Sequence, residues 1–232
     1  VSEALRGEPG TSFVLKVLRP LKNDSTVMEF KITRKSIRTN PIPYYGMVRD
    51  SIGYLTLTGF TENCAKDFKK ALIGLKQQGA KSLIVDLRDN GGGSLTEAID
   101  IVNYFVPKNQ EILVTKGKLK QAQNSYKTQN EPLDERIPLV VLVNGSSASA
   151  SEIVSGSLQD LDRAVIIGSR TFGKGLVQTI RPLPYNATLK VTTSKYYIPS
   201  GRCIQAIDYA KKNADGSVAR IPDSLTTVFH TA

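Results

Sequence analysis

The sequence has little of what several common active sites require. Its 232 residues include one histidine, His230, and two cysteines, Cys64 and Cys203. A histidine-based triad would depend on a residue close to the end of the chain, and the two cysteines lack the short spacing of metal-ligand pairs. We therefore expect no metal site, and we expect both cysteines to be small buried hydrophobic side chains.

Long apolar runs are also missing. No stretch approaches the roughly 18 apolar residues of a membrane-spanning helix, so we expect no integral membrane segment in this chain. A basic start followed by an apolar stretch, the pattern of a signal peptide, is absent too. The chain opens on Val1 and not on methionine, so we expect an excised or processed piece.

Basic residues are in excess, with 31 Lys and Arg against 21 Asp and Glu and a net charge of +10. Such a charge can bind the phosphate backbone of nucleic acid or keep a surface solvated. The basic residues are scattered, with small clusters at 116–120 and 211–212. This favours a solvated surface and no nucleic-acid partner. A nucleic-acid-binding domain, whose affinity for nucleic acid would fall steeply with salt, is kept as a third hypothesis beside the two given at the end of this section.

The order of apolar patterns predicts an α/β protein. Residues 1–36 contain two expected strands, 13–19 and 27–34, joined by a polar turn at 23–25. From Ile42 onward strands alternate with helices, which favours a layered α/β core. Strands are expected at 52–58, 82–87, 112–115, 138–143, 164–167 and 189–198, helices at 61–78, 94–106 and 150–160, and an exposed hairpin or loop at 117–136. The apolar run 82–87 is typical of a strand buried on both faces.

Residues 86–93, DLRDNGGG, follow this strand and precede a helix. Three glycines allow a sharp turn and a close approach to a ligand, and their N–H groups can converge on negative charge. This suits an oxyanion hole. The same glycines also suit a tight turn without a ligand, which spacing alone favours.

Residues 144–152, NGSSASASE, lie at the junction of an apolar strand and a helix. A serine nucleophile at such a turn is exposed and lies at the positive end of the helix dipole. However, Ser149 and Glu152 also match a helix-capping box, and for any single serine the capping role is favoured.

Lys174 lies between two glycines in the segment 171–178, TFGKGLVQ. Burial disfavours the charged form of an amine, so a lysine shielded by Phe172, Leu176 and Val177 can accept a proton from a serine. Gln178 is a candidate to orient that amine. The alternative is a lysine that reaches solvent from a turn.

Residues 168–174, GSRTFGK, match the first seven positions of a phosphate-binding P-loop. The next position requires Ser or Thr to bind magnesium, and it is Gly175. We therefore do not expect nucleotide binding.

Taken together, these segments resemble the tail-specific, or C-terminal processing, protease family. Its members are Ser-Lys endopeptidases with a ClpP/crotonase-like core and a PDZ domain. Residues 86–93 resemble the family's Asp-Leu-Arg-x-Asn-x-Gly-Gly segment, and 147–152 its nucleophile segment. Residues 171–175 resemble its general-base segment, and 193–202 a further strand and turn.

The resemblance implies roles for particular residues. Ser149 is the expected nucleophile and Lys174 the expected general base, with Gln178 in the position of a residue that supports the lysine. The backbone N–H groups of Ala150 and of Gly92, or of a glycine beside Gly92, would form the oxyanion hole.

The resemblance also implies a domain organisation. Residues 1–36 resemble the C-terminal part of an incomplete PDZ domain, and 37–232 the protease core, truncated at its C-terminus. The expected fold is α/β: a layered ClpP/crotonase-like core with a mixed sheet and flanking helices, preceded by a partial β-rich PDZ segment. Asp160 falls where some members place a structurally important carboxylate, and we assign it no catalytic step.

The leading hypothesis is a serine endopeptidase that cleaves protein substrates near their C-termini through an acyl-enzyme, without a metal or organic cofactor. The expected partner is a protein or peptide, engaged through an unstructured C-terminal tail. The resemblance suggests an extracytoplasmic location, such as the bacterial periplasm or cell envelope, and leaves the oligomeric state open. The alternative is a non-catalytic module that binds peptides or apolar ligands on the same fold.

Overall fold

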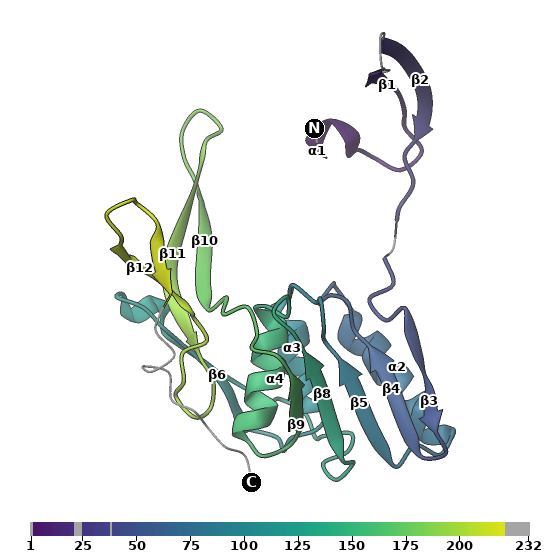
Figure 1. Ribbon diagram of the computed structural model, residues 1–232, viewed down its shortest axis with the longest axis vertical. Helices are drawn as coiled ribbons and strands as arrows, with labels where there is room; N and C mark the ends of the chain where they lie inside the picture. The colour runs from purple at the N-terminus through teal and green to yellow at the C-terminus, as the bar shows by residue number, and fades with distance from the viewer. Residues whose placement is uncertain (1, 21–24, 38, 221–232) are drawn as a thin grey trace. The chain divides into compact units, whose positions relative to one another are not determined.

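The computed structural model describes residues 2–20, 25–37 and 39–220 (Figure 1). It divides into two compact units, Val1–Asn40 and Pro41–Ala232, and each is described by itself. His230, the chain end at Ala232 and residues 23–24 of the turn expected in the first unit lie outside the described residues.

The first unit contains a short helix and a hairpin. These elements are α1 (Ser2–Leu5), β1 (Ser12–Pro20) and β2 (Ser25–Thr33), with β1 and β2 antiparallel. The strands predicted at 13–19 and 27–34 are confirmed to within two residues. Arg34 ties the helix to the hairpin: it donates to the Leu5 carbonyl and to Thr11 Oγ1, each at 3.0 Å, and it lies 4.5 Å from the centre of the Phe13 ring.

The second unit is built on a five-stranded sheet. In spatial order its strands are β3 (Tyr44–Arg49), β4 (Ile52–Thr56), β5 (Ser82–Asp86), β8 (Leu139–Val143) and β9 (Val165–Gly168). β3 is antiparallel to β4, and the other neighbours are parallel. The helices that connect the parallel strands are α2 (Cys64–Gln77), α3 (Leu95–Asn103) and α4 (Ala150–Asp160).

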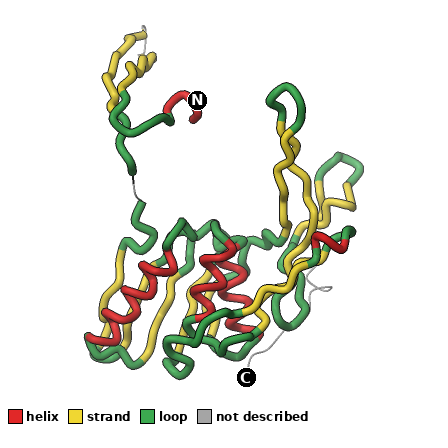
Figure 2. The backbone as a smooth tube through the Cα atoms, turned by 180° about the vertical axis from the view of Figure 1, so that it is seen from behind, coloured by secondary structure: helices red, strands yellow, loops and turns green. Residues whose placement is uncertain are grey.

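All three helices lie on one face of this sheet (Figure 2). The parallel strands follow one another across the sheet in sequence order, so right-handed crossovers place each connecting helix on the same side. The prediction that β5 is buried on both faces is therefore wrong. Leu83 and Val85 face the helices and are buried, whereas Ile84 on the opposite face is only half-buried.

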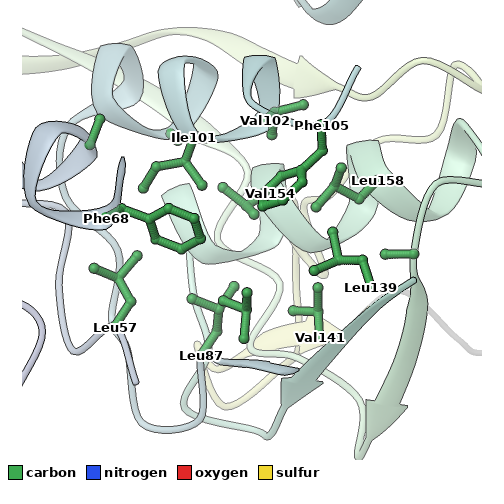
Figure 3. Packing of buried hydrophobic residues seen from close by; sticks show 14 of the residues in the cluster. Leu57, Phe68, Leu87, Ile101, Val102, Phe105, Leu139, Val141, Val154 and Leu158 are labelled. Atoms are coloured by element: carbon green, nitrogen blue, oxygen red, sulfur yellow. The ribbon is translucent and has the colours of Figure 1, made fainter. Parts of the chain in front are cut away.

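The hydrophobic core fills the space between the helices and the sheet. Figure 3 shows Phe68 of α2, Ile101 of α3 and Val154 of α4 converging on Leu87 and Val141 from the sheet side. The apolar face predicted for α2 is confirmed, because all its members are buried: Cys64, Phe68, Ala71, Leu72 and Leu75. Burial of each large member, Phe68, Leu72 and Leu75, contributes about 1.5–3 kcal/mol, so this face holds α2 against the sheet.

A second sheet contains β10 (Leu176–Pro182), β11 (Thr188–Tyr197), β6 (Glu111–Lys116) and β7 (Asn124–Lys127), in that spatial order. All its neighbours are antiparallel. The polar segment 117–136 forms a short 3-10 helix (Lys120–Ala122) and β7, which pairs with β6 as a hairpin. Farther along, β12 (Ile207–Lys212) pairs with β13 (Val218–Arg220).

Several boundaries differ from the sequence prediction. α2 begins at Cys64 instead of residue 61, and α3 ends at Asn103 instead of residue 106. The capping box expected at the start of α3 is only half formed. Ser94 Oγ accepts the N–H of Glu97 at 3.4 Å, but the Glu97 carboxylate accepts the N–H groups of Asn63 and Ala65 and so caps α2.

The cysteine prediction holds for one residue of the two. Cys64 is buried, and that burial raises the pKa of its thiol to about 12. Cys203 is exposed, so its prediction as a buried side chain is wrong. Within the described residues, no helix has the length and apolar character needed to cross a membrane.

Candidate active site

Two neighbouring parallel strands bring the glycine loop and the serine segment together. β5 pairs with β8 from Leu83 with Leu139 to Asp86 with Leu142, so both chains leave the sheet at the same edge. Side chains then join the two loops. The Asp89 N–H donates to Asn144 Oδ1 at 3.0 Å, and Asn144 Nδ2 donates to Asp89 Oδ1 at 2.9 Å. The two motifs therefore lie side by side because each follows one of two adjacent parallel strands, β5 and β8.

The fully buried Asn90 is the centre of this junction. Its Nδ2 donates to the Leu57 carbonyl at 2.8 Å, and its Oδ1 accepts the N–H of Gly92 at 2.9 Å. Its main-chain oxygen accepts the Ala148 N–H at 3.0 Å and the Ser151 hydroxyl at 2.8 Å. Asn90 thus links the glycine loop to the residues on both sides of Ser149.

Asp86 anchors the start of the glycine loop. Its carboxylate accepts hydrogen bonds from Tyr54 Oη at 2.5 Å, from the Arg88 backbone N–H at 3.0 Å and from Arg88 Nη2 at 2.6 Å. Burial alone raises the pKa of this carboxyl, but the hydrogen bonds from Arg88 and Tyr54, together with the charge of Arg88, outweigh burial and leave the pKa below its usual value. Asp86 is therefore held as a carboxylate that shapes the loop.

Ser149 has an unusual backbone conformation for a helix-capping residue. It immediately precedes α4, with φ of 57° and ψ of −112°. Capping residues normally have extended backbone angles, so capping alone does not account for this geometry. Such a conformation costs a non-glycine residue about 1–3 kcal/mol and persists mainly at functional positions. A sharp, strained turn from strand to helix is the geometry that exposes a serine nucleophile.

The buried Glu152 carboxylate joins the serine turn to the lysine loop. Its Oε2 accepts the N–H groups of Ser149 and Lys174, each at 2.8 Å. Its Oε1 accepts the N–H of Gly173 at 2.6 Å and the Thr171 hydroxyl at 2.8 Å. The capping-box motif identifies the bond to Ser149, but nothing in the sequence pairs Glu152 with residues about twenty positions away. This second role is the main feature that sequence reasoning missed.

Lys174 itself is exposed, so the prediction of a lysine shielded from solvent is wrong for this structure. Phe172, one of its expected apolar covers, is 49% exposed. The Lys174 backbone is nevertheless linked to the Ser149 backbone, because both N–H groups donate to the Glu152 carboxylate. Gln178 lies in β10 and is also exposed.

The segment 168–174 is not arranged as a phosphate-binding loop. The strand β10 follows it, where a P-loop leads into a helix. In addition, the N–H groups of Gly173 and Lys174 donate to the Glu152 carboxylate. This arrangement agrees with the sequence argument against nucleotide binding.

Gly92 lies against the serine turn. A Cβ atom at this position would lie 2.6 Å from the Ala148 oxygen, 2.8 Å from Ser149 Cβ and 3.0 Å from the Ala150 nitrogen. The Gly92 backbone therefore lies directly against the backbone of residues 148–150. However, the Gly92 N–H donates to Asn90 Oδ1, so in this structure it is not directed towards an oxyanion beside Ser149.

Replacing Gly92 with alanine is expected to displace the serine turn. Gly92 has φ of 98°, and the added methyl group would collide with backbone atoms that cannot move independently. We expect a loss of about 1–3 kcal/mol in the free energy of unfolding and roughly 100-fold lower activity. Urea denaturation and proteolysis assays measure both. Gly145→Ala is the control, since its nearest contact is 3.8 Å away, and unchanged activity in Gly92→Ala would contradict this account.

Asp160 lies at the other end of α4 from Ser149, about 16 Å away along the helix axis. Its carboxylate pairs with Arg202 and accepts the N–H of Ser200 at 3.0 Å. Arg202 also donates to Gln159 Oε1 at 2.9 Å. These bonds fix the turn after β11 against α4, which is a structural role. Among the described residues, no group of three or more His, Cys, Asp or Glu side chains could hold a metal ion.

The sequence of this chain is similar to those of known peptidases. Residues 51–211 match the model of peptidase family S41. The chain is 40% identical over 209 residues to a carboxy-terminal-processing protease from Bartonella bacilliformis, covering 88% of this chain and 47% of that protein. It is 40% identical over 199 residues to a carboxyl-terminal-processing protease from Picosynechococcus sp., covering 84% of this chain and 46% of that protein. The chain thus spans about half the length of these relatives.

A solved structure supports the same likeness. The photosystem II D1 C-terminal processing protease superposes with a TM-score of 0.65 at 29% sequence identity. The match covers 86% of this chain and 54% of that one.

Proposed function

Because this chain belongs to peptidase family S41, we propose that it forms the core of a serine endopeptidase of the C-terminal processing type. In this proposal Ser149 is the nucleophile and Lys174 the general base. The observation that carries it is the strained backbone of Ser149, with φ of 57° at the start of α4. A cap does not require that conformation, and a nucleophile at a strand-to-helix turn does.

The proposed reaction proceeds through an acyl-enzyme. The Lys174 amine takes the proton from Ser149 Oγ as this oxygen attacks the carbonyl carbon of the scissile peptide bond. The ammonium then gives the proton to the leaving amine. A water molecule, deprotonated by the same lysine, cleaves the ester and restores the serine.

A lysine acts as a base only when its amine is neutral. Lys174 is exposed in this structure, so we infer that the bound substrate covers it. Exclusion of water disfavours the charged amine and strengthens the electrostatic interactions inside the covered site. The Glu152 bonds hold the Lys174 backbone beside the serine turn while the side chain is still solvated.

The oxyanion of the tetrahedral intermediate needs N–H donors beside Ser149. In the proposal one donor is the Ala150 N–H, which also benefits from the positive end of the α4 dipole. The second comes from the glycine loop. If it is Gly92, its hydrogen bond to Asn90 must be exchanged when substrate binds; Gly91 and Gly93 are the other candidates.

The remaining features of the proposal derive from the family resemblance. They comprise a ClpP/crotonase-like layering of the core at 37–232, a partial PDZ segment at 1–36, and Gln178 as a residue that supports Lys174. The proposed substrate is a protein engaged through its unstructured C-terminal tail, as in tail-specific proteases. The proposed location is extracytoplasmic.

A serine-directed fluorophosphonate tests the proposal without knowledge of the substrate. We expect the probe to label the folded chain at Ser149 alone, because only an activated serine reacts at neutral pH. Peptide mapping by mass spectrometry identifies the labelled residue. The proposal fails if the folded protein neither reacts with the probe nor cleaves labelled casein. The non-catalytic binding module would then be the better account.

A further inference from the structure

Residues 205–206, which lie outside the proposed catalytic motifs, also form hydrogen bonds with the backbone around Lys174. Ala206 N–H donates to the Gly173 carbonyl at 3.0 Å. The side chain of Gln205 accepts the N–H of Gly175 through Oε1 at 2.8 Å. Lys174 is thus the middle residue of a tripeptide held by Glu152 on one side and by Gln205 and Ala206 on the other.

Gln205 is built into this position. It is only 6% exposed, and its Nε2 donates to the Ile207 carbonyl at 3.0 Å, so both ends of the amide have partners. The orientation of the amide is determined by its neighbours, because an N–H group requires the oxygen and a carbonyl requires the nitrogen. Leucine can fill the same volume but satisfies neither partner.

Gly173 and Gly175 allow residues 205–206 to lie close to the lysine loop. A Cβ atom on Gly175 would lie 2.4 Å from the backbone nitrogen of Gln205, and one on Gly173 would lie 2.2 Å from Ala206 Cβ. Gly173 also has φ of 86°, which favours glycine. The glycines that flank Lys174 are therefore explained by packing against residues 205–206.

We propose that Gln205 is a positioning residue for the general base. The three consecutive N–H groups of Gly173, Lys174 and Gly175 all donate to two buried side chains, Glu152 and Gln205. Together these bonds set the direction in which the exposed Lys174 side chain leaves the backbone. Gln205 acts through Lys174 and does not touch the substrate. This inference rests on the proposed function, since it presupposes that Lys174 is the base.

The test compares Gln205→Leu with wild type by fluorophosphonate labelling of Ser149. The dependence of the labelling rate on probe concentration separates the maximal rate of modification from the half-saturating concentration. We expect the maximal rate to fall by about 100-fold, the effect of displacing a catalytic group by about 1 Å, with half-saturation within about twofold of wild type. Gln205→Glu keeps an acceptor for the Gly175 N–H, so it should recover part of the rate.

Gln110→Leu is the matched control, because it removes a side-chain hydrogen bond to a carbonyl away from the site, from Nε2 to the Glu111 oxygen at 3.2 Å. It should label at the wild-type rate. If Gln205→Leu does not fold, Gln205→Asn takes its place, since the shorter amide cannot reach both partners and should show the same loss.

The outcomes separate the two proposals. If wild type is labelled at Ser149 and the folded Gln205 variants react equally fast, the positioning role is wrong and the proposed function stands. A loss that appears only as weaker half-saturation also overturns the positioning role. If wild type is not labelled and does not cleave casein, the proposed function fails, and the inference fails with it.

Discussion

Ser149→Ala is expected to abolish proteolysis, with a rate at least about 1,000-fold below wild type, while the protein stays folded. Alanine removes the attacking oxygen but keeps the Cβ atom, so the strained turn and the bond from the backbone N–H to Glu152 are retained. Lys174→Ala should cause a similar loss, because the hydroxyl then has no base. Cleavage of labelled casein and urea denaturation measure the two properties independently.

The double variant sharpens this test. Residues that act as one unit do not contribute additively, so Ser149→Ala combined with Lys174→Ala should be no slower than either single variant. Ser146→Ala is the matched control, because Ser146 is exposed in the same segment and should retain wild-type activity. Normal cleavage by a folded Ser149→Ala protein would exclude Ser149 as the nucleophile.

Glu152→Gln is expected to impair both stability and activity. The carboxylate accepts four hydrogen bonds from the serine turn and the lysine loop, and it donates none. Glutamine has the same shape but turns one oxygen into an NH2 group that faces N–H donors. We expect the free energy of unfolding to fall by about 3 kcal/mol, since buried donors lose a charged acceptor. Activity should fall by about 100-fold because the Lys174 backbone is released.

Two controls define this result. Glu131→Gln makes the same chemical change at an exposed position and should alter stability by less than about 0.5 kcal/mol. Activity should also be measured at a temperature where Glu152→Gln is fully folded. Wild-type labelling of Ser149 in that folded variant would show that the link between serine and lysine is not needed for catalysis.

The helices and parallel strands were the most predictable part of the fold. The apolar spacing of α2 and the short apolar runs of β5 and β8 identify these elements because each has a face in the core. β10 escaped prediction because its residues, LVQTIRP, do not alternate between apolar and polar along the strand. β12 and β13 also escaped prediction; they pair with each other as an antiparallel hairpin.

The site was predictable only as separate motifs. The turn at Asn144 and the glycine loop are each local signals, and both follow expected strands. Their contact follows from the parallel pairing of β5 with β8, which an alternating strand and helix pattern favours. The exposure of Lys174 could not be read from its glycine neighbours, because these glycines serve close packing against Gln205 and Ala206 instead of burial of the lysine.

The sequence by itself determined which local motifs are present, namely the glycine loop, the serine segment and the lysine between two glycines, because each is a run of neighbouring residues. It also determined the alternation of strands and helices, since each element needs an apolar face of its own period. Only the tertiary structure decided that the buried Glu152 carboxylate accepts hydrogen bonds from both Ser149 and Lys174, and that Gln205 accepts one from Gly175 in the same loop. The bonds to the lysine loop join residues about twenty to thirty positions apart. Such polar contacts produce no periodic pattern in the sequence, because the partners are brought together only by folding.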